Sequence, residues 1–136
     1  MFTRRLRRLQ ISTTSETRPG RASARTVAEA KFALTPEQAF VRGIVCNALV
    51  CLAVWLSLGA RSAAGKVLVI VLPIAALVAL GFEYSVANMF RLPVGIGAGA
   101  DGGFAEVVAN LVPVTLGNIV GGVATAYHLA YAPDRD

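Results

Sequence analysis

Residues 81–85, with the sequence Gly-Phe-Glu-Tyr-Ser, place a carboxylate, a phenol and a hydroxyl in the middle of an apolar stretch. A carboxylate at the centre of a membrane-spanning helix costs about 2.5–3.5 kcal/mol on insertion scales, so it requires partners or a purpose. Glycine and polar residues at that depth interrupt a helix, and the freed backbone groups are tolerated only where they line a cavity or are buried in protein. The pattern predicts a polar break in a membrane helix, with Gly81, Glu83 and Ser85 as its structural residues.

A second set of polar and helix-weakening residues lies in the last apolar stretch. It comprises Asn110, Pro113, Thr115, Gly117, Asn118, Gly121 and Gly122. Gly117 and Gly121 form a GxxxG spacing, which allows two helices to approach closely, and we count Gly122 with them as a helix-packing residue. Two interpretations stay open: the polar residues line a pathway, or the whole set serves packing between helices.

The remaining reactive side chains form no catalytic constellation. Cys46 and Cys51 lie five residues apart in one apolar stretch, about 140° apart around a helix, which favours packing over a disulfide or a metal site. The single histidine, His128, has no evident companion ligands, and no HExxH, CxxC or P-loop spacing occurs. We therefore expect no enzyme activity, no metal and no cofactor.

The composition predicts a membrane protein. The 136 residues are 55% hydrophobic and only 15% charged, which is too apolar for a soluble globule. Three long stretches carry no formal charge: Gly43–Ala60, Val67–Phe82 and Val107–Tyr131. We predict an all-α, multi-pass protein of the cell membrane. Its helices are expected at about residues 36–60, 67–90 with an interruption at 81–85, and 106–131.

The positive charge is concentrated near the N-terminus. The net charge is +5, and nine of the thirteen basic residues lie in the first 42 positions. No groove-reading motif accompanies them, so they indicate membrane topology or lipid contact rather than nucleic-acid binding. We expect residues 1–27 to be a disordered basic tail, with a short amphipathic helix at a membrane surface as the alternative. Thr35 as N-cap and Pro36 as first helical residue predict the start of the first membrane helix, and residues 132–136 form a short polar tail.

Three motifs, in this order, resemble the formate/nitrite transporter family. They are RGIVCNALVCLAVW (42–55), KVLVIVLPIAALVALGFEYSVANMF (66–90) and NLVPVTLGNIVGG (110–122). The resemblance covers residues 28–131 and none of residues 1–27. It implies an aquaporin-like fold of two inverted three-helix halves, with broken second and fifth helices, assembled as a homopentamer with one pore in each subunit. The chain is similar to helices four to six. It is therefore expected to form half of this fold, three transmembrane helices with a broken middle helix, and to lack a complementary first half.

Individual residues match positions of the family pattern. Lys31, sixteen residues before Asn47, takes the place of a lysine at the mouth of the pore. Leu77 takes a position that narrows the channel. Glu83 matches the glutamate of the broken helix, and we expect it to bind backbone donors or a side chain of the missing half. The asparagine that follows this glutamate and the polar residues of the last helix are also matched. These are Asn88, Asn110, Thr115 and Asn118.

Tyr84 departs from the family pattern, which usually has a histidine after this glutamate. A phenol can donate a hydrogen bond to an anion but stays neutral near pH 7, so it cannot hold a proton for transfer. The resemblance implies transport of small monovalent weak-acid anions such as formate or nitrite across a lipid bilayer. Lys31 would concentrate the anions, and Leu77, Tyr84, Asn88, Thr115 and Asn118 would line the pathway.

The alternative function is that of a truncated remnant that does not transport and only associates with other helices. The orientation signals disagree, because family topology puts the N-terminal flank outside whereas the basic residues favour the inside. The loss of resemblance before residue 28 suggests a truncated or split gene, or a misassigned start.

Overall fold

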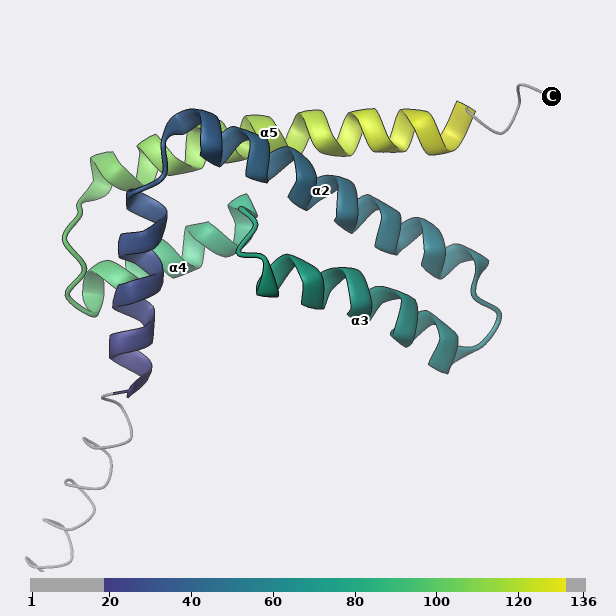
Figure 1. Ribbon diagram of the computed structural model, residues 1–136, viewed down its shortest axis with the longest axis horizontal. Helices are drawn as coiled ribbons and strands as arrows, with labels where there is room; N and C mark the ends of the chain where they lie inside the picture. The colour runs from purple at the N-terminus through teal and green to yellow at the C-terminus, as the bar shows by residue number, and fades with distance from the viewer. Residues whose placement is uncertain (1–18, 132–136) are drawn as a thin grey trace, which may run out of the picture.

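The computed structural model describes residues 19–131, and every regular element in that range is a helix (Figure 1). Residues 19–32 are helical. They are followed by α2 (Pro36–Gly59), α3 (Ala63–Ala79), α4 (Ser85–Gly97) and α5 (Phe104–Tyr131). In Figure 1, α3 and α4 follow one another with an irregular segment between them, and the helical segment 19–32 crosses α4 and the start of α5.

The start of α2 follows the local sequence signal. The Thr35 hydroxyl accepts a hydrogen bond from the Gln38 backbone N–H at 3.3 Å, and the Gln38 side chain accepts one from the Thr35 N–H at 3.3 Å. This capping box satisfies donors that the first turn of a helix leaves unpaired, and Pro36 occupies a position where its missing N–H costs nothing. The helix therefore begins where Thr35 and Pro36 predict.

Two of the described helices, α2 and α5, are long and apolar enough to cross a membrane. The third apolar helix, α3, is shorter at 17 residues, and Leu77 is its one buried residue. Most other large side chains of α3 are exposed, including Leu68, Leu72 and Val78. In a membrane these exposed apolar side chains suit contact with lipid or with further helices.

The polar break separates α3 from α4. Leu80 caps α3, Gly81 adopts a left-handed conformation with φ of +64°, and residues 82–84 are irregular. A positive φ is open to glycine because it has no Cβ. Ser85, which we expected to lie in the interruption, is already the first residue of α4.

The expected end of this segment near residue 90 is wrong, because α4 continues through Pro93 to Gly97. Proline removes one hydrogen bond from the helix but does not end it where the flanking turns are held by packing. Here Leu92 and Gly95, on either side of Pro93, are both buried.

Residues 19–27 also differ from the expected disordered tail, since they are helical. The segment 19–32 packs against α4 and the start of α5, where Ala28, Leu92, Ala100 and Val107 form a small apolar core. A Cβ atom on Gly95 would collide with Ala28, so the two helices approach as closely as glycine allows. A boundary at residue 28 is therefore absent from the fold. Residues 1–18 and the polar tail 132–136 lie outside the described residues.

The closest packing of long helices joins the first half of α2 to α5, and the two helices diverge toward their C-terminal ends (Figure 1). Cβ atoms added to Gly117 and Gly121 would collide with the carbonyl oxygens of Phe40 and Ile44 in α2. From the other side, a Cβ on Gly43 would lie 2.7 Å from the carbonyl oxygen of Val114. Backbone therefore meets backbone along this contact, which requires small residues on both helices.

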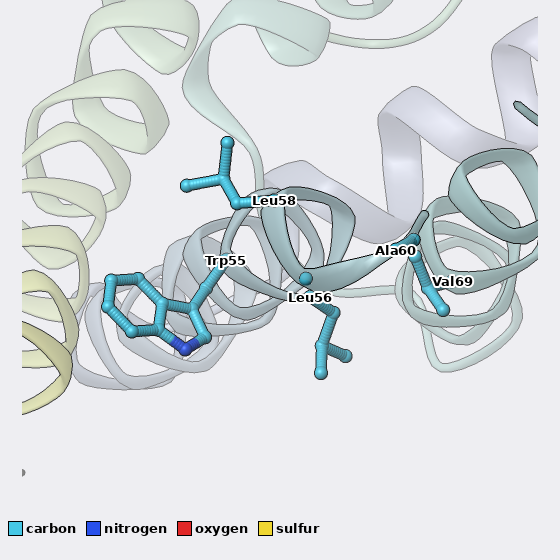
Figure 2. A pocket seen from close by; sticks show the side chains of 6 residues that line it. Trp55, Leu56, Leu58, Ala60 and Val69 are labelled. Carbon is cyan, nitrogen blue, oxygen red and sulfur yellow. The ribbon is translucent and has the colours of Figure 1, made fainter. Parts of the chain in front are cut away.

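An apolar pocket of about 500 Å³ lies where α2 turns into α3 (Figure 2). Its lining residues come from the end of α2, the turn and the first half of α3. They are Trp55, Leu56, Leu58, Gly59, Ala60 and Val69. Apart from the indole N–H and the backbone, nothing in this lining is polar, and it holds none of the residues that the sequence singled out.

Gly121→Ala is expected to destabilise the pair of α2 and α5 by about 1–3 kcal/mol, the usual cost of overpacking, because the new methyl group meets the Ile44 carbonyl. The control is Gly97→Ala, since a Cβ at Gly97 meets nothing within 4 Å. Thermal unfolding in detergent micelles measures both variants. Equal melting temperatures for the two would contradict the close contact.

Candidate functional site

A buried ion pair lies where the helical segment 19–32 meets the break between α3 and α4. The Lys31 ammonium nitrogen lies 2.7 Å from Oε1 of Glu83, and the two side chains are only 8% and 1% exposed. Each charge would be costly to bury alone, so the two stabilise each other there. Glu83 therefore has its cationic partner within this chain.

Two asparagines extend the ion pair into a closed ring. The Asn88 side-chain amide donates to Oε2 of Glu83 and, at 3.0 Å, to Oδ1 of Asn110. The Asn110 amide donates in turn to the backbone carbonyl of Lys31 at 3.2 Å. We call these four residues, Lys31, Glu83, Asn88 and Asn110, the polar ring. All four are buried, and together they tie the segment 19–32, the break, α4 and α5.

The polar ring corrects one expectation. We expected Glu83 to bind backbone donors or a side chain of a missing half, but its carboxylate binds the side chains of Lys31 and Asn88. The pairing was not apparent from the sequence because Lys31 lies 52 residues before Glu83. One acceptor of the ring, Oδ1 of Asn88, is buried and has no hydrogen-bond partner among the described residues.

Asn118 forms a second polar centre, at the start of α4. Its Oδ1 accepts hydrogen bonds from the Ser85 backbone N–H at 2.9 Å and from the Ser85 hydroxyl at 3.0 Å. Its amide donates to the carbonyl oxygens of Gly43 at 2.9 Å and Glu83 at 3.0 Å. The full hydrogen-bonding capacity of this side chain is used. Tyr84, the N-cap residue of α4, makes no side-chain capping bond, so Asn118 of α5 takes over that function.

Sequence reasoning missed two contributors to this second centre. The Asn47 amide donates to the Asn118 backbone carbonyl at 2.6 Å, and the Gly43 carbonyl binds the Asn118 side chain. An asparagine inside an apolar stretch was a usable signal for Asn47. Nothing in the sequence marks the carbonyl of Gly43, because a backbone acceptor is not encoded by residue type.

Two cavities open beside the break. The first, about 500 Å³, we call the charged cavity, because Lys31, Arg42, Glu83 and Arg91 are among its lining residues. The second, about 250 Å³, we call the apolar cavity. It is lined by Cys46, Val50, Ile74, Leu77, Val78, Phe82, Tyr84, Ala87 and Arg91. The two cavities share Val78 and Arg91, so they adjoin at these side chains.

The six residues predicted to line a pathway fall into two groups. Lys31 lines the charged cavity, and Leu77 and Tyr84 line the apolar cavity. The other three line neither cavity. They are Asn88, Thr115 and Asn118. The two asparagines are buried and bound within the protein, and Thr115 is half-buried on α5.

Metal chemistry finds no support in the described part of the chain. No group of three or more histidine, cysteine or acidic side chains lies close enough there to hold a metal ion. The arrangement can instead do three things: hold a buried ion pair in place, present positive charge to a cavity, and place a phenol beside an apolar cavity.

Comparison with known proteins gives consistent results. A probable formate transporter of Methanothermobacter thermautotrophicus is 47% identical over 130 residues, which cover 83% of this chain and 47% of that protein. An uncharacterised transporter of Bacillus subtilis, YrhG, is 43% identical over 120 residues, covering 86% of this chain and 45% of its own length. The formate channel FocA of Escherichia coli is 39% identical over 121 residues. The chain thus spans about half the length of the curated relatives it matches.

Solved structures agree with these relatives. A pentameric formate channel with formate bound superposes with a TM-score of 0.76 at 40% identity, covering 91% of this chain and 58% of that one. An ion channel of the same family superposes with a TM-score of 0.73 at 34% identity. The relatives are transporters and channels, not enzymes, and they place the chain among membrane proteins.

The sequence pattern that defines the formate/nitrite transporter family matches residues 8–132. It therefore extends twenty residues further toward the N-terminus than the resemblance drawn from the three motifs, which began at residue 28. Because this match includes almost the whole chain and agrees with the relatives and with the fold, the chain belongs to the formate/nitrite transporter family.

Proposed function

We propose that the chain forms half of a membrane pathway for small monovalent weak-acid anions such as formate or nitrite. The observation that carries the proposal is the break between α3 and α4. It is held by buried side chains and lies beside one cavity with cationic residues and one that is largely apolar. The other half is a segment equivalent to the remainder of the longer relatives. The names of those relatives, a probable formate transporter and formate channels, support the choice of substrate.

The proposed arrangement in the membrane has three crossings: α2, the broken pair of α3 and α4, and α5. Helices of 17 and 13 residues, at about 1.5 Å per residue, are together long enough to cross an apolar layer of about 30 Å. The chain would then supply three of six helices. We further propose a homopentamer in the cell membrane, which the pentameric structural neighbour supports.

The proposed mechanism separates capture from passage. An anion first enters the charged cavity, where positive charge raises its local concentration. It then meets the apolar cavity at Leu77, where an ion pays a large desolvation cost. A low dielectric favours the neutral form of a weak acid, so the substrate takes up a proton from the aqueous solution on the entry side, crosses as the neutral acid, and releases the proton to the solution on the other side. Tyr84 lines this cavity, and its hydroxyl would orient the substrate by a hydrogen bond.

Lys31 has a positioning role in this proposal. The sequence suggested that Lys31 attracts anions. Its charge is already bound to Glu83, however, so it is poorly placed for that role. Through the polar ring it instead fixes the break, and the break in turn fixes Tyr84 and the start of α4. The free acceptor of Asn88 is a further place where a water or a donor from the completing half would be bound.

We expect proteoliposomes that contain this chain together with a first half from a relative to take up labelled formate and nitrite faster than empty liposomes. Uptake should depend on both halves, because this chain alone encloses no complete pathway in the proposal. Insertion of both chains is verified by protease protection. If the inserted pair transports no faster than empty liposomes, the chain is a membrane protein that only associates with other helices, and the proposal fails.

Lys31→Met is expected to destabilise the fold by about 3–5 kcal/mol, because it leaves the Glu83 carboxylate buried without a cation. The double variant Lys31→Met with Glu83→Gln should recover most of that loss, since it removes the uncompensated charge. Thermal unfolding of both variants in detergent makes the comparison. Arg25→Met, which breaks the exposed pair with Glu29, is the control and should change little. A double variant no more stable than Lys31→Met would exclude the ion pair as the cause.

Tyr84→His is expected to add a pH-dependent step in formate binding that a phenol at this position does not provide. An imidazole ordinarily titrates near about pH 6.5, whereas a phenol stays neutral there. The half-saturation concentration for formate in the paired assembly should therefore show a new inflection between about pH 5.5 and 7.5 in this variant. Tyr84→Phe, which removes only the hydroxyl, should keep the profile of the natural chain. If the natural chain, with Tyr84, shows an inflection of the same size, a group other than the imidazole is responsible for it and the prediction fails.

A further inference from the structure

The charged cavity has an excess of positive charge that the polar ring does not use. Three cationic side chains line it, Lys31, Arg42 and Arg91, against a single carboxylate, Glu83. Since Lys31 and Glu83 neutralise each other at 2.7 Å, the excess of two positive charges belongs to the two arginines. These arginines were not among the residues singled out for the pathway.

Neither arginine is committed to another partner in the described part of the chain. The two ion pairs found there join Arg25 to Glu29 and Lys31 to Glu83. Arg42, from the second turn of α2, and Arg91, from the middle of α4, are both exposed. Both guanidinium groups therefore keep their donors available to a ligand.

The position of Arg91 is unusual for a charged residue. It is the one formally charged residue in α4, a helix that is otherwise apolar apart from Ser85 and Asn88. An arginine in such a membrane segment faces a water-filled cavity or the interior of a bundle, because contact with lipid is costly. Arg91 lines both cavities, and it shares the lining of the apolar cavity with Leu77 and Tyr84.

Arg91 lines the same cavity as the phenol of Tyr84. Ala87 and Arg91 are four residues apart, so they lie on one face of α4, and Tyr84, the N-cap residue of that helix, lines the apolar cavity with both of them. An anion held at Arg91 is therefore on the side of α4 that leads to Tyr84. Arg42 and Arg91 both line the charged cavity.

We propose that Arg42 and Arg91 form the anion-capture site of the pathway, selective for small planar oxyanions such as carboxylates and nitrite. The proposal rests on the transport function proposed above. A guanidinium group donates two parallel hydrogen bonds to a carboxylate-like group and stays charged at any physiological pH. Capture at Arg42 would load the charged cavity, and transfer to Arg91 would bring the anion to the entrance of the apolar cavity.

The first test measures formate uptake by the paired assembly with Arg42→Gln, with Arg91→Gln and with Arg61→Gln as the matched control. Arg61 is exposed in the turn between α2 and α3 and lines neither cavity. Each cavity variant should raise the half-saturation concentration by about three- to tenfold at low salt, with a smaller effect at high salt because exposed charges are screened. Unchanged half-saturation in both variants, in an assembly that transports, overturns the capture site and leaves the transport function standing.

The second test needs no transport and uses the natural chain. Phenylglyoxal modifies accessible arginines, and peptide mass spectrometry reports the rate at each position in the inserted paired assembly. Formate or nitrite at millimolar concentration should slow modification of Arg42 and Arg91 at least threefold, while Arg61 should react as before.

Chloride at the same ionic strength is the control for general screening in the second test, and it should protect the two arginines much less than formate does. If formate leaves the modification rate unchanged at each of the three arginines, the capture site is overturned, even if the assembly proves inactive. Slow modification of Arg42 and Arg91 already without formate would show that a carboxylate of the completing half holds them, and this outcome overturns it as well.

Discussion

The buried pair of Lys31 and Glu83 is the constraint on which the rest of the structure depends. Burying either charge alone would cost several kcal/mol, so the helical segment 19–32 and the break after α3 must stay together once both are inside. The two asparagines of the polar ring then tie α4 and α5 to the same centre. A buried ion pair need not add net stability, but breaking it is costly, and that makes it a strong determinant of geometry. The position of Tyr84 follows directly, because it is the residue next to Glu83.

The break itself is stable because another helix supplies what it lacks. A helix that starts in the middle of a protein exposes N–H groups that its own chain usually caps. In α4 this cap comes from Asn118, which also binds the carbonyls of Gly43 and Glu83. The close contact of α2 and α5 brings Asn118 to this point, since Gly117 and Gly121 let the two backbones meet. Glycines that look like simple packing residues thus determine where a polar side chain reaches the break.

Local signals in the sequence predicted the structure reliably, whereas contacts between residues far apart in the sequence could not be predicted. The start of α2 at Pro36 could be predicted because its cap lies within four residues. Lys31 and Glu83 could each be selected by likeness to a family, but their direct contact could not, because 52 residues separate them. The helical state of residues 19–27 was missed because their composition is polar, whereas their helix is held by packing of Ala28 against α4 and α5. Pro93 misled for the same reason, since tertiary packing on both sides outweighs one lost hydrogen bond.

The cationic residues of the charged cavity are of two kinds, one paired with a carboxylate and two unpaired within the described part of the chain. The charge of Lys31 is neutralised by Glu83, so this lysine has a structural role and contributes little positive electrostatic potential to the cavity. Arg42 and Arg91 keep theirs, and a guanidinium group does not titrate at any physiological pH. Capture of an anion would then be independent of pH, while its conversion to the neutral acid beside Leu77 would favour low pH. With a phenol at position 84, no side chain at the break needs to change its charge during passage. The substrate itself then carries the proton, so the strength of the acid would limit its passage, whereas the two arginines would act on which anions are captured.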